Sequence, residues 1–152
     1  MSVKTEINWY YRAILSSITP RNSPENNRAL IEEIIEADFK LVKGALDLIL
    51  SGSIAKVNFA PNQQPTSQSF YSILSKDKTR QYLVMQGYCD CFYFAEHVLS
   101  RATSFTCTHE LACVLLEHMS ADLQKDGDNF LHSVEELDEE EFLERMHLLY
   151  DE

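Results

Sequence analysis

Apolar residues in the first fifty positions recur every three to four residues, a spacing that predicts amphipathic helices. The first helix is expected over Val3–Ser17 and ends before Thr19-Pro20, because the residue before a proline avoids the helical conformation. Ser23-Pro24 has the residue types preferred at an N-cap and a first helical position, so a second helix begins there. We expect Gly44 to divide this second stretch and Gly52 to end it. The apolar stripes favour packing in a common core over a dedicated groove for a partner.

Short runs of aromatic and β-branched residues follow, which predict strands over Ile54–Phe59, Ser69–Ser75 and Arg80–Tyr88. Such short strands joined by turns form a small antiparallel meander. The segment Pro61–Gln68 is too polar to pack in a core and is expected to be a loop.

The last third returns to helical spacing. One helix is predicted after Cys107, with apolar positions at Leu111, Ala112, Leu115, Leu116 and Met119. Ser133-Val-Glu-Glu136 has the form of a capping box, which predicts an acidic helix over 133–150 that packs on the domain or, less favourably, docks on a partner. The fold class is therefore α+β in one domain, 1–152. It comprises a helical part (1–52), a β-meander with a metal element (53–120) and the acidic C-terminal helix.

Composition and charge narrow the functional classes. The 24 acidic residues outnumber the 13 basic ones, and the net charge of −11 opposes binding to a phosphate backbone. No stretch approaches the length of an apolar membrane span, and the first residues do not form a signal peptide, so we expect a reducing compartment and no membrane. Lys76, Lys78 and Arg80 form a basic cluster, which as a hairpin turn is more simply a solvated surface than a nucleic-acid contact.

Two close pairs of metal-ligand residues carry the strongest chemical signal, Cys89-Asp-Cys91 and Cys107-Thr-His109. Thiolate sulfur and imidazole nitrogen suit a tetrahedral Zn²⁺ ion. At a strand end, positions i and i+2 point to the same face, so Cys89 and Cys91 can face one ion. Within a helix, i and i+2 diverge by about 200°, so Cys107 is expected at or before an N-cap with His109 in the first turn.

Glu110 has the position of the acidic member of a capping box at that helix start. Because protein ligands fill all four positions, the zinc site is predicted to be structural. Two disulfides are the alternative, but cysteines one residue apart rarely bridge comfortably. His97 and Cys113 lack a paired spacing, and Cys113 is expected to be a small buried residue. Phe92, Tyr93 and Phe94 are expected to shield the metal, although exposed aromatics there could stack on bases.

Cys89, Cys91, Cys107 and His109, with Ala112 after them, resemble the SWIM-type zinc finger. The flank from Leu30 to Met119, including Ala45–Ile49 and Phe70–Leu74, is similar to the small SWIM-domain subunits of Shu complexes. The resemblance implies a nuclear role in DNA repair by homologous recombination. It implies binding to a recombinase paralogue, assembly of the recombinase filament, and DNA contact through that partner. Against this family, Pro61–Gln68 has the character of an insertion.

Motifs for catalysis are not found: the sequence has no phosphate-binding loop, nucleophile elbow or zinc-protease helix. We therefore expect a non-enzymatic interaction module without a small-molecule substrate. The alternative is a zinc module that binds single-stranded nucleic acid directly through Lys76, Lys78, Arg80 and the aromatic run. A third interpretation is a scaffold in an unrelated complex.

Overall fold

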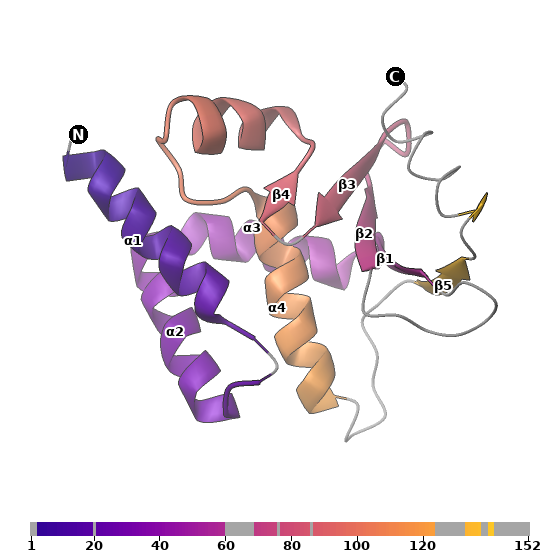
Figure 1. Ribbon diagram of the computed structural model, residues 1–152, viewed down its shortest axis with the longest axis horizontal. Helices are drawn as coiled ribbons and strands as arrows, with labels where there is room; N and C mark the ends of the chain where they lie inside the picture. Colours follow the sequence, from indigo (N-terminus) through magenta and orange to yellow (C-terminus); the bar gives the residue numbers. More distant parts are fainter. Residues whose placement is uncertain are drawn as a thin grey trace.

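The computed structural model describes residues 3–19, 21–59, 69–75, 77–85, 87–123, 133–137 and 140–141. Its elements are α1 (Val3–Ser17), α2 (Pro24–Ala37), α3 (Phe39–Leu50), β1 (Ile54–Phe59), β2 (Ser69–Leu74), β3 (Gln81–Met85), β4 (Tyr88–Cys89), the π-helix η2 (Phe94–Ser100), α4 (Thr108–Leu123) and β5 (Ser133–Leu137). The predicted α+β class is confirmed, with helices first, then a small antiparallel sheet, then a helix (Figure 1).

Side-chain caps set the helix boundaries. The Ser23 hydroxyl accepts a hydrogen bond from the backbone N–H of Asn26, and Pro24 occupies the first turn, as the sequence predicts. The break between α2 and α3 lies at Asp38, whose carboxylate accepts from the backbone N–H of Leu41. The expected break at Gly44 is therefore wrong. Gly44 lies inside α3, where a Cβ atom would come within 3.1 Å of Thr108, so glycine allows α3 to approach the start of α4 closely.

The sheet has the order β4-β3-β2-β1-β5, and its first four strands are antiparallel neighbours. Residues alternate between its two faces. Tyr71 and Val84 are paired across β2 and β3 on the face that meets the helices. Val57, Phe70 and Leu83 form a smaller buried cluster on the other face.

The third predicted strand is interrupted before Tyr88. The chain turns at Gly87, which has a φ of 81°, and returns as β4 beside β3. A residue with positive φ is favoured as glycine, so Gly87 permits this tight turn. The turn places Cys89 opposite Val84, on the helix-facing side of the sheet.

The C-terminal prediction is corrected at its start. Residues Ser133–Leu137 form β5, parallel to β1, where a helix was predicted over 133–150. The open edge of β1 offers unpaired backbone donors and acceptors, and pairing with them outweighs the local capping-box pattern. Glu140 and Glu141 are helical, and the rest of the predicted helix lies outside the described residues, as does the loop Pro61–Gln68.

Helices cover one face of the sheet, and α4 lies between the α1–α2 pair and the strands (Figure 1). The main core gathers where α3 and α4 pack together and against β2 and β3. Its fully buried side chains include Ile34, Ile54, Ile73 and Leu111. Among the described helices, none is both long and apolar enough to cross a membrane.

Candidate metal centre

The structure brings the two predicted ligand pairs to one point. Cys89 ends β4, Cys91 follows two residues later, and Cys107 and His109 stand at the start of α4. One ligand atom from each of these four residues lies within 4.8 Å of the others. A tetrahedral zinc ion with bonds of about 2.0–2.3 Å needs ligand atoms separated by roughly 3.5 Å. The four side chains therefore could hold one metal ion with small adjustments.

Cys107 is the N-cap of α4, as predicted. Its sulfur accepts a hydrogen bond from the backbone N–H of Glu110 at 3.4 Å, and its carbonyl accepts from Leu111. Cys91 has a similar partner, because the backbone N–H of Phe94 donates to its sulfur at 3.3 Å. Both bonds stabilise negative charge on sulfur, and the positive end of α4 adds to the effect.

Two further observations indicate that these four side chains suit a metal ion. Cys89, Cys91 and Cys107 are free thiols, each almost fully buried. The Nδ1 atom of His109 is buried and has no hydrogen-bond partner among the described residues. Buried polar nitrogens are normally paired, so this orphaned atom fits a histidine that serves a metal.

Without a cation, the three thiols compete for negative charge. Hydrogen bonds from the thiols of Cys107 and Cys89 lower the pKa of Cys91. Hydrogen bonds with Cys107 and Cys91, together with burial, raise the pKa of Cys89. A divalent cation would take the place of the thiol protons.

An aromatic stack holds the histidine ring. Tyr82 lies on the helix-facing side of β3, and its ring stacks on His109 with centroids 4.4 Å apart and planes at 30°. The guanidinium of Arg80 lies 4.9 Å from the centroid of the Tyr82 ring. This stack restricts the orientation of the imidazole before any metal binds.

Replacing Tyr82 with leucine should weaken metal affinity about tenfold, because partners that orient a ligand contribute on this scale. Competition with a chromophoric chelator measures the effect. The matched control is Tyr93→Leu. Tyr93 packs on His97 with centroids 4.5 Å apart, but His97 is not part of the cluster. Equal affinity losses in the two variants would contradict the role given to Tyr82.

A buried ion pair joins α1 to the metal-binding corner, and sequence reasoning missed it. Arg12 donates to both carboxylate oxygens of Glu110 and to the carbonyl of Phe105 at 2.9 Å. The Thr106 hydroxyl donates to the same carboxylate at 2.6 Å. Glu110 thus does not act as the acidic member of a capping box, because its carboxylate turns to Arg12 instead. The partners are 98 residues apart, and no local pattern signals their contact.

The three aromatic residues that follow Cys91 differ in burial. Phe94 is fully buried, with the Tyr88 ring at its edge and the Arg12 guanidinium 5.3 Å from its centroid. Phe92 and Tyr93 remain exposed, which corrects the expectation that all three pack around the metal. A helical step here turns Phe94 inward and leaves its two predecessors outside.

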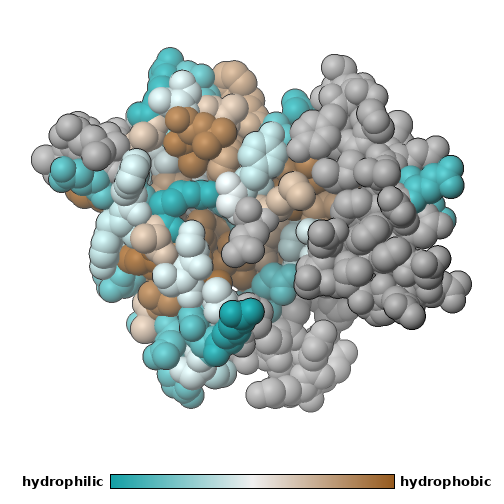
Figure 2. Space-filling view, viewed as in Figure 1, coloured by the Kyte–Doolittle hydropathy of each residue, from teal (hydrophilic) through white to brown (hydrophobic). Residues whose placement is uncertain are grey.

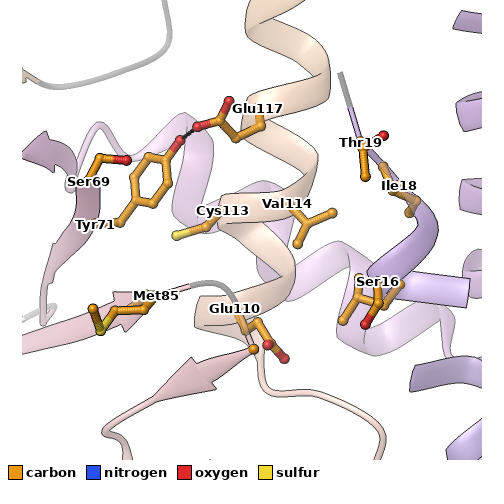
Figure 3. A pocket seen from close by; sticks show the side chains of 13 residues that line it. Ser16, Ile18, Thr19, Ser69, Tyr71, Met85, Glu110, Cys113, Val114 and Glu117 are labelled. Atoms are coloured by element: carbon orange, nitrogen blue, oxygen red, sulfur yellow. Dashed lines mark hydrogen bonds between the residues drawn. The ribbon is translucent and has the colours of Figure 1, made fainter. Parts of the chain in front are cut away.

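Cys113 is buried away from the ligand cluster, as expected of a small apolar residue. It lines a cavity of about 330 Å³ between α4, the end of α1 and strands β2 and β3. In the close view its sulfur points from α4 toward the strands, below the hydrogen bond between Tyr71 and Glu117 (Figure 3). Burial raises the pKa of the Cys113 thiol, which therefore stays protonated.

The basic cluster is only partly described. Lys76 lies outside the described residues, Lys78 is exposed, and Arg80 is half-buried with its guanidinium over Tyr82. Hydrogen bonds from Ser75 and Thr79 lower the pKa of Asp77 to about 2, so a carboxylate stands within this turn at neutral pH.

No family model matches the chain, and no curated protein or solved structure matches it either.

Proposed function

We propose that this chain is a non-enzymatic subunit of a nuclear homologous-recombination complex, in which one structural zinc ion shapes the surface that binds a recombinase paralogue. The gathering of Cys89, Cys91, Cys107 and His109 carries the proposal. The two ligand pairs have the spacing of the SWIM-type finger that they resemble. The partner then contacts DNA and promotes filament assembly.

The zinc has a structural role in this account. Four protein ligands complete a tetrahedral shell and leave no position for water or substrate. The ion would tie the end of β4 to the start of α4, two segments joined by η2 and its flanking loops. The corner formed by these elements would then be one rigid unit.

Exposed apolar residues beside this corner favour a protein partner. Phe92 is 75% exposed and Leu99 is 62% exposed, and Tyr93 lies between them in the chain. Hydrophobic surface lies over η2 and the loop after it, at the top of the molecule (Figure 2). η2 is a π-helix, in which the N–H of Arg101 donates to the carbonyl of Glu96. Such helices are rare and are frequently found at functional sites. We place the paralogue-binding face on Phe92, Tyr93 and Leu99.

Phe92→Ser should weaken partner binding by about 2 kcal/mol, roughly thirtyfold in Kd, as expected for an aromatic anchor at an interface. Titration calorimetry with the purified recombinase paralogue measures the change. Zinc content should stay unchanged, because Phe92 faces solvent. The control Phe39→Ser removes a similarly exposed phenylalanine from α3 and should leave this affinity intact. Undiminished binding by Phe92→Ser would remove Phe92 from the proposed interface.

Direct binding of nucleic acid is less well supported. The net charge is −11, and the Asp77 carboxylate offsets positive charge in the turn that carries Lys78. Arg80 is engaged with Tyr82. Salt-dependent binding of single strands by the isolated chain, with a slope reduced by Lys78→Ala, would favour this alternative over the proposed one.

A further inference from the structure

The outer face of α3 carries an apolar stripe that nothing in the described structure covers. Phe39 is 66% exposed, Leu46 37% and Leu50 69%. Together with Lys43, these residues are spaced four, three and four positions apart along the chain. At 100° per residue, all four lie within about 60° of one another around the helix. This is the spacing of a seam between two packed helices.

An adjoining side of α3 is already used. Leu41, Val42, Ala45 and Ile49 are buried in the main core, where α3 packs against α4. The stripe is therefore a second apolar face of the same helix, and none of its residues belongs to the ligand cluster or to η2. Apolar helix faces are normally buried against another element.

The charges beside the stripe are self-complementary. Lys40 and Asp47 are both exposed and lie on the same flank of the seam. When two copies of α3 pack antiparallel about a two-fold axis, Phe39 of one copy lies opposite Leu50 of the other, and Lys43 lies opposite Leu46. Lys40 then faces Asp47 of the other copy, and the symmetry repeats this pair. The aliphatic part of Lys43 can cover the seam while its ammonium reaches solvent.

We propose that α3 is a homodimerisation helix, whose stripe Phe39, Lys43, Leu46 and Leu50 packs antiparallel on the same stripe of a second copy of this chain. The reciprocal placement of Lys40 and Asp47 identifies a second copy as the occupant. This contact is independent of the partner face formed by Phe92, Tyr93 and Leu99, so the homodimer can carry one paralogue on each copy.

The contact is short, so the dimer should be weak. A twelve-residue helix is about 18 Å long, and a seam of this length belongs with interfaces under about 1,200 Å² in total. We therefore expect a dissociation constant in the micromolar range or above. Physiological salt is needed in the experiment, because it screens the repulsion between two copies with a net charge of −11 each.

Sedimentation equilibrium of the zinc-loaded full chain, from about 5 to about 500 µM, tests the proposal. The wild type should show a monomer–dimer equilibrium, and Leu50→Glu should weaken it at least tenfold. Leu99→Glu is the matched control, because Leu99 has similar exposure but lies on η2. Circular dichroism and zinc content verify that each variant is folded.

A charge exchange tests the antiparallel arrangement itself. Lys40→Glu and Asp47→Lys should each weaken the dimer, because each creates two like-charged contacts. The double variant should recover wild-type association, because it restores both pairs in reverse. A chain that stays monomeric throughout, equal effects of Leu50→Glu and Leu99→Glu, or no recovery in the double variant would each overturn the proposal. The proposal would also fail if the wild-type chain were monomeric but carried a different protein, and Leu50→Glu released that protein.

Discussion

A Cys107→Ser chain is expected to lose its zinc and, with the ion, several kcal/mol of folding free energy, because binding at a structural site contributes directly to folding. Serine at this position isolates the metal effect. It is a preferred N-cap residue, so it can still accept the hydrogen bond from the N–H of Glu110 and support the start of α4. What it cannot supply is a thiolate for the ion.

Metal analysis and urea unfolding of the purified variant measure both losses, and co-purification with the paralogue should fall with them. Cys113→Ser is the control, since Cys113 is buried within the same helix, α4, but outside the ligand cluster. It should retain one zinc ion per chain. Partner binding that survives complete loss of zinc from Cys107→Ser would separate the interface from the metal and refute the proposed mechanism.

The second large effect is expected at Arg12. Replacing it with alanine should destabilise the fold by about 3 kcal/mol, because it leaves a buried carboxylate without its cation. The side chain of Glu110 is only 5% exposed, and that of Arg12 is 26% exposed. After the substitution, the Thr106 hydroxyl would be the remaining side-chain donor to Glu110 among the described residues.

The exposed pair of Arg101 and Glu96 provides the comparison. Its atoms lie 2.7 Å apart, yet Arg101→Ala should cost less than about 1 kcal/mol because solvent screens the pair. An Arg12→Met, Glu110→Leu double variant should be more stable than Arg12→Ala, because no buried charge is left unpaired. Equal losses in the free energy of unfolding for Arg12→Ala and Arg101→Ala would show that the buried pair does not hold α1 to the metal-binding corner.

Local signals in the sequence predicted most of the helices and strands. The N-cap at Ser23 and the apolar spacing of α1 and α4 are properties of neighbouring residues, and they were sufficient. The position of Cys107 also followed from local geometry, because positions i and i+2 diverge by about 200° within a helix and can face one ion only where the helix begins. The coming together of the four ligands could be expected from their chemistry, since their spacing suits a single ion.

Features that depend on distant contacts were missed. β5 forms because the edge of β1 is available, and the residues 133–137 contain no sign of that edge. Glu110 turns from its local capping position to Arg12 because α1 packs beside it. The turn at Gly87 is the exception, since its glycine could have indicated a break in the predicted strand.

The binding of one zinc ion by Cys89, Cys91, Cys107 and His109 is the central claim, and X-ray absorption at the zinc edge of the purified chain tests it most directly. The account predicts one zinc ion per chain with three sulfur ligands at about 2.3 Å and one nitrogen at about 2.0–2.1 Å. A purified chain that takes up no zinc, or a zinc shell dominated by oxygen, would contradict it.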